Sequence, residues 1–208
     1  MNRITRFDFA ERAVHWIVAI AFTYAALSGL SLWSRKLFWI ATILGGGSVV
    51  RALHPWGALV FAVALALMFR RWASHMRLDD QDRIWLSGMR KYMVNDEAGL
   101  PPPGKFNAGQ KMMFWTQAAL TLLLLASGLV LWFPEVAPRS LRLFAVLIHP
   151  LAAIAAIGGI IVHVYMGTSV VPGSMTAMIR GWVTERWAAA HHPRWKPIQG
   201  ANSRHSRP

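Results

Sequence analysis

Four long runs of apolar residues divide the chain, and each is long enough, or nearly so, to cross a membrane. They cover residues 14–33, 53–70, 112–133 and 143–167, and all nine acidic residues lie outside them. A helix needs roughly 20 apolar residues to span a bilayer. The second run is short by that measure, but it can be extended at either end. The pattern predicts an all-α integral membrane protein with a four-helix transmembrane bundle.

The connections between these runs hold residues that end helices. Residues 45–47 are all glycine, and residues 101–104 read Pro-Pro-Pro-Gly in the longest connection. Such stretches exclude a continuous helix. The first run follows three arginines, as a signal peptide would, but it exceeds the roughly 7–15 apolar residues of a signal core. We therefore expect one domain over residues 1–195, first helix included, and a disordered basic tail over residues 196–208.

The distribution of charge predicts the orientation. The net charge is +13, and 17 of the 22 lysines and arginines lie before the first run, from Arg70 at the end of the second run to the start of the third, or after the fourth. Positively charged connections stay in the cytoplasm. The sequence thus predicts a multi-pass protein of the bacterial inner membrane with both termini cytoplasmic. The basic balance indicates this topology and contact with anionic membrane lipid, and not binding of nucleic acid.

Histidine is the candidate metal ligand, because the absence of cysteine excludes iron–sulfur clusters and thiolate zinc sites. An ionisable group inside a membrane needs a partner or a function. Taken singly, each histidine is more often a hydrogen-bonded structural residue than a ligand. Four of the eight lie within or at the edge of the apolar runs: His15, His54, His149 and His163.

Helical spacing favours two haems over four unrelated histidines. His149 and His163 are 14 positions apart, which places them within roughly 40° on one helix face and about 21 Å apart. His54 begins the second run at the outer level of His149, and His15 begins the first run at the inner level of His163. We therefore predict iron ligands in two pairs, His54 with His149 outside and His15 with His163 inside. Two histidines close both axial positions, which favours electron transfer, whereas zinc usually takes three or four clustered ligands.

A weak repeat relates the two halves of the chain. His15 precedes Ser28 by 13 positions, and Phe114 precedes Ser127 by the same interval. Each half then reaches a His-Pro pair, at residues 54–55 and 149–150. A pseudo-two-fold axis normal to the membrane would explain the match, although chance matches are common in apolar sequence. Both interpretations stay open.

Several residues near the predicted haems have two interpretations. Phe114 and Met68 are the repeat counterparts of the inner ligands and are expected to line the site without binding iron. Gly158 and Gly159 allow close approach either of a macrocycle or of a neighbouring helix. The remaining histidines are expected to be solvated surface residues: His75, His191, His192 and His205.

One segment carries a family resemblance. Residues 105–115 read Lys-Phe-Asn-Ala-Gly-Gln-Lys-Met-Met-Phe-Trp. With His-Trp at 15–16, Leu-His-Pro at 53–55, Ile-His at 148–149 and the stretch 186–195, this segment resembles the cytochrome b556 (gamma) subunit of formate dehydrogenase. The matches run in family order over nearly the whole chain.

The resemblance implies a di-haem cytochrome b that passes electrons from an iron–sulfur (beta) subunit through two haem b groups to menaquinone at the cytoplasmic side. The four family ligands fall on the four histidines above. The family's quinone pocket falls on Asn107, Gly109 and Gln110, close to His163. Asn107 is alternatively the N-cap of the third membrane helix. The chain would be the electron-transfer and quinone-reducing subunit of an oxidoreductase, with the dehydrogenase site in a molybdenum- or tungsten-containing (alpha) subunit and no catalytic residue of its own.

Two other classes of function remain. The chain could serve another quinone-linked oxidoreductase, such as a hydrogenase or a thiosulfate reductase, or act as a stand-alone di-haem cytochrome b. A haem-free membrane transporter or assembly protein is a less favoured alternative.

Overall fold

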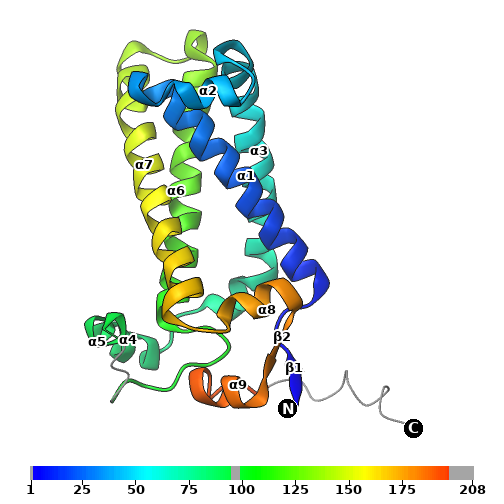
Figure 1. The fold of residues 1–208 in the computed structure, drawn as a ribbon. Helices are drawn as coiled ribbons and strands as arrows, with labels where there is room; N and C mark the ends of the chain where they lie inside the picture. The colour runs from blue at the N-terminus through cyan, green and yellow to red at the C-terminus, as the bar shows by residue number, and fades with distance from the viewer. Residues whose placement is uncertain (1, 95–98, 197–208) are drawn as a thin grey trace. The chain divides into compact units, whose positions relative to one another are not determined.

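Four long helices dominate the computed structural model, which describes residues 2–94 and 99–196 (Figure 1). Each is long and apolar enough to cross a membrane: α1 (Phe9–Trp33), α3 (Gly47–Trp72), α6 (Ala108–Trp132) and α7 (Arg139–Tyr165). The all-α fold with four candidate membrane helices is thereby confirmed. The described residues depart from helix and loop only in two short strands.

The helices start earlier than the apolar runs that predict them. α1 begins at Phe9 and α6 at Ala108, and their added first turns carry polar residues such as Glu11 and Lys111. A criterion based on hydropathy cannot detect these turns. Beyond the helices, a 3-10 turn η2 (Ala73–Met76) continues α3, and a π-helical turn η4 (Met166–Val170) follows α7.

Short elements occupy the connections and the two ends of the chain. The 3-10 turn η1 (Arg35–Leu37) and α2 (Trp39–Ile43) follow α1, and η3 (Pro134–Val136) precedes α7. The long connection predicted as a loop contains α4 (Asp80–Ser87) and α5 (Met89–Met93). The terminal elements are β1 (Arg3–Thr5), α8 (Ser174–Arg180), β2 (Trp182–Thr184) and α9 (Glu185–His191).

The chain divides into two compact units. The bundle unit comprises Ala13–Ala73 and Met113–Tyr165, and the loop unit comprises Met1–Arg12, Ser74–Met112 and Met166–Pro208. The single domain over residues 1–195 stays a prediction. The tail expected at residues 196–208 lies outside the described residues, apart from Lys196.

Aromatic contacts join neighbouring helices of the bundle unit. Phe22 of α1 meets Phe61 of α3 edge-on, with ring centres 5.4 Å apart. Trp56 of α3 and Trp132 of α6 make a similar contact at 5.3 Å. Edge-to-face pairs of this kind add about 0.5–1.5 kcal/mol beyond their buried area. They fix α3 between α1 and α6.

The glycine pair of α7 has two different surroundings. A Cβ at Gly159 would lie 2.6 Å from Nε2 of Gln117, and this buried amide donates to the Ala156 carbonyl oxygen at 3.0 Å. Gly159 therefore serves close packing of α6 on α7, as small residues do in membranes. A Cβ at Gly158 would meet nothing within 4 Å, so helix packing does not require that glycine.

The loop unit joins the two ends of the described chain. β1 pairs with β2 in antiparallel register, with Ile4 opposite Val183. The amides of Arg6 and Phe7 then donate to the Gly181 carbonyl oxygen at 2.8 and 3.2 Å. Figure 1 shows the two strands side by side. The N-terminal segment and the segment after the fourth membrane helix thus lie together.

Candidate functional site

The outer histidine pair comes together in the bundle unit. The ring centres of His54 on α3 and His149 on α7 are 6.4 Å apart, with ring planes at 80°. A proline follows each histidine within its helix, Pro55 and Pro150. Proline removes one backbone hydrogen bond from the helix interior. The two halves therefore share both the histidine and this local interruption.

Each outer histidine is held by a serine on the helix packed against it. Ser28 Oγ of α1 is 2.8 Å from Nδ1 of His54, and Ser127 Oγ of α6 is 2.9 Å from Nδ1 of His149. Both hydroxyls also contact the carbonyl oxygen four residues earlier in their own helix, at 2.6 and 2.7 Å. The repeat seen in the sequence thus recurs as matching contacts.

A glycine follows each of these serines and lets the ring approach the helix. A Cβ at Gly29 would lie 3.1 Å from Cε1 of His54, and one at Gly128 would lie 3.3 Å from Cε1 of His149. Such distances are tighter than ordinary van der Waals contact. The Ser-Gly dipeptide therefore supplies a hydrogen-bonding partner and a surface for the ring at once.

The inner pair has the same separation but different surroundings. The ring centres of His15 on α1 and His163 on α7 are 6.2 Å apart, with planes at 49°. Nδ1 of His15 is buried, and it has no hydrogen-bond partner within the described part of the chain. The edge of Trp16 faces His15 at 5.5 Å. The inner site thus lacks the serine contact at His15.

The separations suit a metal ion held between two imidazoles. A ring nitrogen binds a transition metal at about 2 Å, so two rings sharing one metal ion have centres about 6 Å apart. Residues 2–94 and 99–196 contain no group of three or more His, Asp or Glu that could hold a metal ion. The structure brings together both predicted histidine pairs, and their role as haem ligands stays a prediction.

The repeat counterparts of the inner ligands make apolar contacts. Phe114 stacks on Phe69 of α3, with ring centres 5.0 Å apart and planes at 13°. Met68 packs against a small core cluster of Ala21, Phe61 and Leu65. The residues at these two positions therefore break the two-fold relationship. Whether Phe114 and Met68 line the inner haem stays a prediction.

Asn107 caps α6 in the loop unit, as the alternative interpretation of this residue requires. Its Oδ1 accepts from the Gln110 amide at 2.9 Å, and Oε1 of Gln110 accepts from the Asn107 amide at 3.0 Å. This reciprocal capping box engages both side-chain oxygens. The NH₂ groups are then the part of each amide that can donate to a ligand. Gly109 lies against Trp85, with 3.4 Å from its would-be Cβ to the indole ring.

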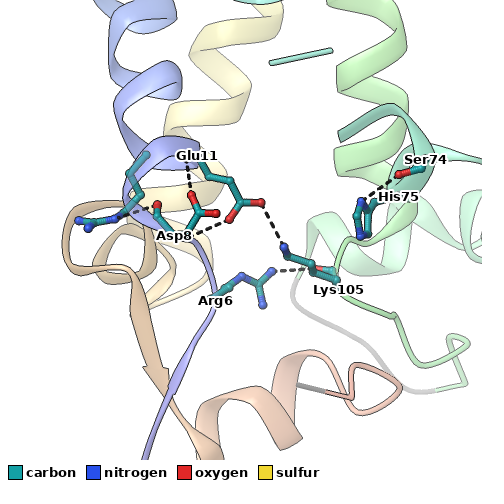
Figure 2. A network of polar contacts seen from close by, with 7 residues as sticks. Arg6, Asp8, Glu11, Ser74, His75 and Lys105 are labelled. Carbon is teal, nitrogen blue, oxygen red and sulfur yellow. Dashed lines mark hydrogen bonds and ion pairs between the residues drawn. The ribbon is translucent and has the colours of Figure 1, made fainter. Parts of the chain in front are cut away.

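Three consecutive carbonyl groups before the cap accept hydrogen bonds. Those of Pro103, Gly104 and Lys105 accept from the Arg194 amide at 3.2 Å, from His192 Nδ1 at 2.7 Å and from Arg6 Nη2 at 2.8 Å. Figure 2 shows Arg6 reaching Lys105, whose Nζ lies 3.4 Å from Glu11. The segment preceding Asn107 is thereby fixed to both ends of the described chain.

The expectation that His192 is solvated is wrong. The residue is 5% exposed, and its Nε2 lies 2.9 Å from Nη2 of Arg6. Burial, and then the charge of Arg6, lowers the pKa of His192 to about 3. The same burial lowers the pKa of Arg6 to about 10. His75 is exposed as expected, His191 is half-buried beside Trp187, and His205 lies outside the described residues.

A buried ion pair next to the cap was missed by sequence reasoning. Lys111, in the first turn of α6, pairs with Asp82 of α4. Asp79 and Asp82 form a reciprocal capping box at the start of α4. The hydrogen bond from the Asp82 amide is the main cause that lowers the pKa of Asp79. Two aspartates three positions apart before an amphipathic stretch were a usable signal for this helix start.

Comparison with known proteins agrees with the sequence resemblance. Residues 6–181 match the family described as prokaryotic cytochrome b561. The cytochrome b556(fdo) subunit of formate dehydrogenase from Escherichia coli K12 is 40% identical over 93% of this chain and 92% of its own length. The nitrate-inducible b556(Fdn) subunit from the same strain is 40% identical over 92% of this chain and 89% of its own.

A more distant relative extends the match. The formate dehydrogenase cytochrome b556 subunit of Haemophilus influenzae is 34% identical over 93% of this chain and 82% of its own length. The matched family and all three relatives are described as b-type cytochromes. The chain therefore belongs to the prokaryotic cytochrome b561 family, among the membrane electron-transfer subunits that include the formate dehydrogenase cytochrome b556 proteins.

Proposed function

We propose that the chain is the di-haem, quinone-reducing membrane subunit of a formate dehydrogenase complex. The observation that carries the proposal is the presence of two histidine pairs with ring centres 6.4 and 6.2 Å apart. Formate is favoured over hydrogen or thiosulfate as the electron source because the relatives named above are formate dehydrogenase subunits. Each of them matches this chain over most of its length.

His54 and His149 would hold the outer haem b, and His15 and His163 the inner one. Three observations support the fit: each pair offers two imidazoles at the spacing for one metal ion, glycines give both outer rings room, and Nδ1 of His15 is buried without a partner in the described chain. When bound, haem b would supply a one-electron carrier at each histidine pair. Each site would take one histidine from α7, and these two histidines, His149 and His163, are about 21 Å apart along the helix.

Asn107, Gly109 and Gln110 of the loop unit would contribute the polar groups of the menaquinone site. The capping box engages the two amide oxygens, which leaves N–H donors as the groups suited to quinone oxygens. Gly109 itself adds no side chain to this segment, and the Trp85 indole ring lies beside it. A site at the start of a helix, beside a polar connection, gives protons from the cytoplasm access to the reduced quinone.

Both termini would lie in the cytoplasm, in a bacterial inner membrane. The pairing of β1 with β2 supports a common side for the two ends, and the excess of lysine and arginine on that side supports a cytoplasmic one. An iron–sulfur subunit would deliver electrons near His54 and His149. The molybdenum- or tungsten-containing subunit of the complex would carry the dehydrogenase site.

Haem content tests the proposal directly. We expect the purified protein to contain two haem b per chain by extraction and to show a b-type reduced-minus-oxidised spectrum. His54→Ala and His149→Ala should each lose one haem, and His15→Ala and His163→Ala should each lose the other. The exposed His75→Ala serves as the matched control with both haems. A chain without b-type absorbance, or one that keeps both haems in all four variants, would contradict the assignment.

Formate-dependent quinone reduction tests the physiological donor. The chain should co-purify with an iron–sulfur subunit and a molybdenum or tungsten subunit, and that complex should reduce a menaquinone analogue when formate is added. Reduction by hydrogen or thiosulfate couples but not by formate would instead support the alternative oxidoreductases.

A further inference from the structure

We propose that Ser28 and Ser127 are positioning residues that fix the tautomer of His54 and His149 and lower the reduction potential of the iron these histidines hold. The inference rests on the proposed haem-binding function. It concerns two hydroxyl groups that the ligand assignment does not use. The two contacts are independent of one another, because they come from different helices, α1 and α6.

The hydroxyls are built into the bundle and not exposed at its surface. Ser28 is 0% exposed and Ser127 is 6% exposed. Hydroxyl groups in such surroundings must find hydrogen-bond partners to offset the cost of burial. Each finds two kinds of partner: a carbonyl oxygen of its own helix and Nδ1 of a histidine across the helix interface.

The number of protons decides the direction of each bond. A serine hydroxyl has one proton and two lone pairs, whereas a carbonyl oxygen can only accept. The proton of Ser28 therefore goes to the Tyr24 carbonyl oxygen at 2.6 Å, and that of Ser127 to the Leu123 carbonyl oxygen at 2.7 Å. Each hydroxyl oxygen can then only accept from the histidine. It follows that Nδ1 carries the ring proton in both histidines and that Nε2 carries the lone pair.

This tautomer is the one a metal ligand needs. A histidine that binds a metal through one nitrogen usually donates its other ring N–H to a nearby acceptor, which orients the ring and raises its basicity. Here the serine oxygen is an acceptor at both rings, joined at His149 by the carbonyl oxygen of Leu124. Gly29 and Gly128 keep each ring beside its serine. A more basic ligand stabilises oxidised iron over reduced iron. The two serines should thus lower the reduction potential of the outer haem.

The inner pair supplies the internal comparison. Nδ1 of His15 has no hydrogen-bond partner in the described chain, so this ring lacks the acceptor that both outer rings have. This difference at His15 should contribute to a lower potential at the outer site than at the inner one. Electrons entering at the outer pair are then favoured to move inward.

Redox titration of single variants tests this inference. The variants are Ser28→Ala, Ser127→Ala and their combination, with the purified holoprotein titrated optically. The inner midpoint is identified from His149→Ala, which should retain only the inner haem. We expect each serine variant to raise the outer midpoint potential, the double variant to raise it further, and the inner midpoint to stay unchanged. Ser31→Ala is the matched control, because Ser31 is 1% exposed and donates only to the Ser28 carbonyl oxygen among the bonds resolved for it.

Three outcomes overturn the proposal: an unchanged outer midpoint with both haems present, an equal shift of both midpoints, or the same shift in Ser31→Ala. If an alanine variant does not retain the outer haem, Ser127→Thr decides. Threonine keeps the hydroxyl, so recovery of the haem at the wild-type midpoint supports the inference and failure to recover it counts against it. Absence of two b-type haems in the wild-type protein would instead contradict the proposed function itself.

Discussion

Lys111 Nζ lies 2.5 Å from Oδ2 of Asp82, in an ion pair whose side chains are only 10% and 5% exposed. The pair joins the first turn of α6 to α4, directly after the Asn107–Gln110 capping box. The same Asp82 oxygen accepts from the Asp79 amide at 2.8 Å. The segment proposed to bind quinone is therefore anchored by buried charge on its helical side.

Removing one charge of this pair should destabilise the loop unit. Lys111→Met leaves the Asp82 carboxylate buried without its cation, and breaking a buried ion pair in this way costs about 3–5 kcal/mol. We expect a lower thermal midpoint in detergent for Lys111→Met. The double variant Lys111→Met with Asp82→Leu should recover most of the loss, because neither charge then remains. A double variant less stable than the single one would contradict this account.

Replacing Asn107 with aspartate can separate its role as an N-cap from its proposed role in binding quinone. Asp is as good an N-cap as Asn, but an aspartate has no N–H to donate. Asn107→Asp should therefore keep α6 stable and both haems bound, while the KM for quinone rises several-fold. Asn107→Ala should also lose about 1 kcal/mol of stability. Steady-state quinone reduction and thermal unfolding measure the two effects.

Gln110→Glu repeats this comparison at the other end of the capping box. Glutamate keeps the reciprocal bond to the Asn107 amide but donates nothing to a quinone oxygen. An unchanged KM in both Asn107→Asp and Gln110→Glu would remove the two amides from the proposed quinone site.

The buried His192 should make the loop unit sensitive to acid. Its pKa in the folded protein is lowered to about 3 from an ordinary value of 6.5, so the unfolded chain binds the extra proton between these two pH values. Stability is therefore fully present above pH 6.5 and declines as the pH falls, by up to about 1.4 kcal/mol per pH unit. Thermal unfolding measured between pH 7.5 and about pH 5 detects the decline, because this range covers the upper part of the interval between the two pKa values.

Replacing His192 and, separately, the exposed His75 tests whether His192 causes the loss of stability at low pH. His192→Gln should lose this component of the pH dependence, whereas His75→Gln should retain it, because His75 is exposed. Equal pH dependence in wild type and His192→Gln would exclude His192 as the cause.

A glycine leaves little room for a side chain beside each outer histidine. In Gly128→Ala the new Cβ would lie 3.3 Å from Cε1 of His149, so the ring must move by a few tenths of an ångström. We expect weaker binding of the outer haem and an unchanged inner haem, measured by haem content after dilution. Gly167→Ala is the control, since a Cβ there meets nothing within 4 Å. Equal retention of the outer haem in both variants would show that the ring tolerates the extra methyl group.

The sequence predicts the membrane helices from hydropathy, and it predicts the histidine pairs from helical spacing together with the level of each histidine in the four-helix topology. Hydropathy finds a helix whose exposed face meets lipid, and the 14-position spacing of His149 and His163 needs only the geometry of one helix. The repeat located Ser28 and Ser127 in the sequence but not their role. That role depends on the approach of two helices, which a single run of residues does not encode.

The loop unit could not be predicted in the same way. Its contacts join distant positions, such as His192 with Gly104 and Ile4 with Val183, and its residues are polar enough to resemble solvated connections. His192 was misassigned for this reason: a histidine followed by proline and arginine has the composition of a surface segment. The start of α4 is different, since its Asp79–Asp82 capping box is a local signal that could have been used.

The pairing of Arg3–Thr5 with Trp182–Thr184 also has a consequence for synthesis of the protein. The first strand leaves the ribosome long before its partner, and all four membrane helices are made in between. The carbonyl groups of residues 103–105 likewise wait for the segment that begins at His192. The segment that precedes Asn107 therefore reaches its final form only after translation has passed the last membrane helix, so a chain truncated before Trp182 would retain its four apolar helices without that support.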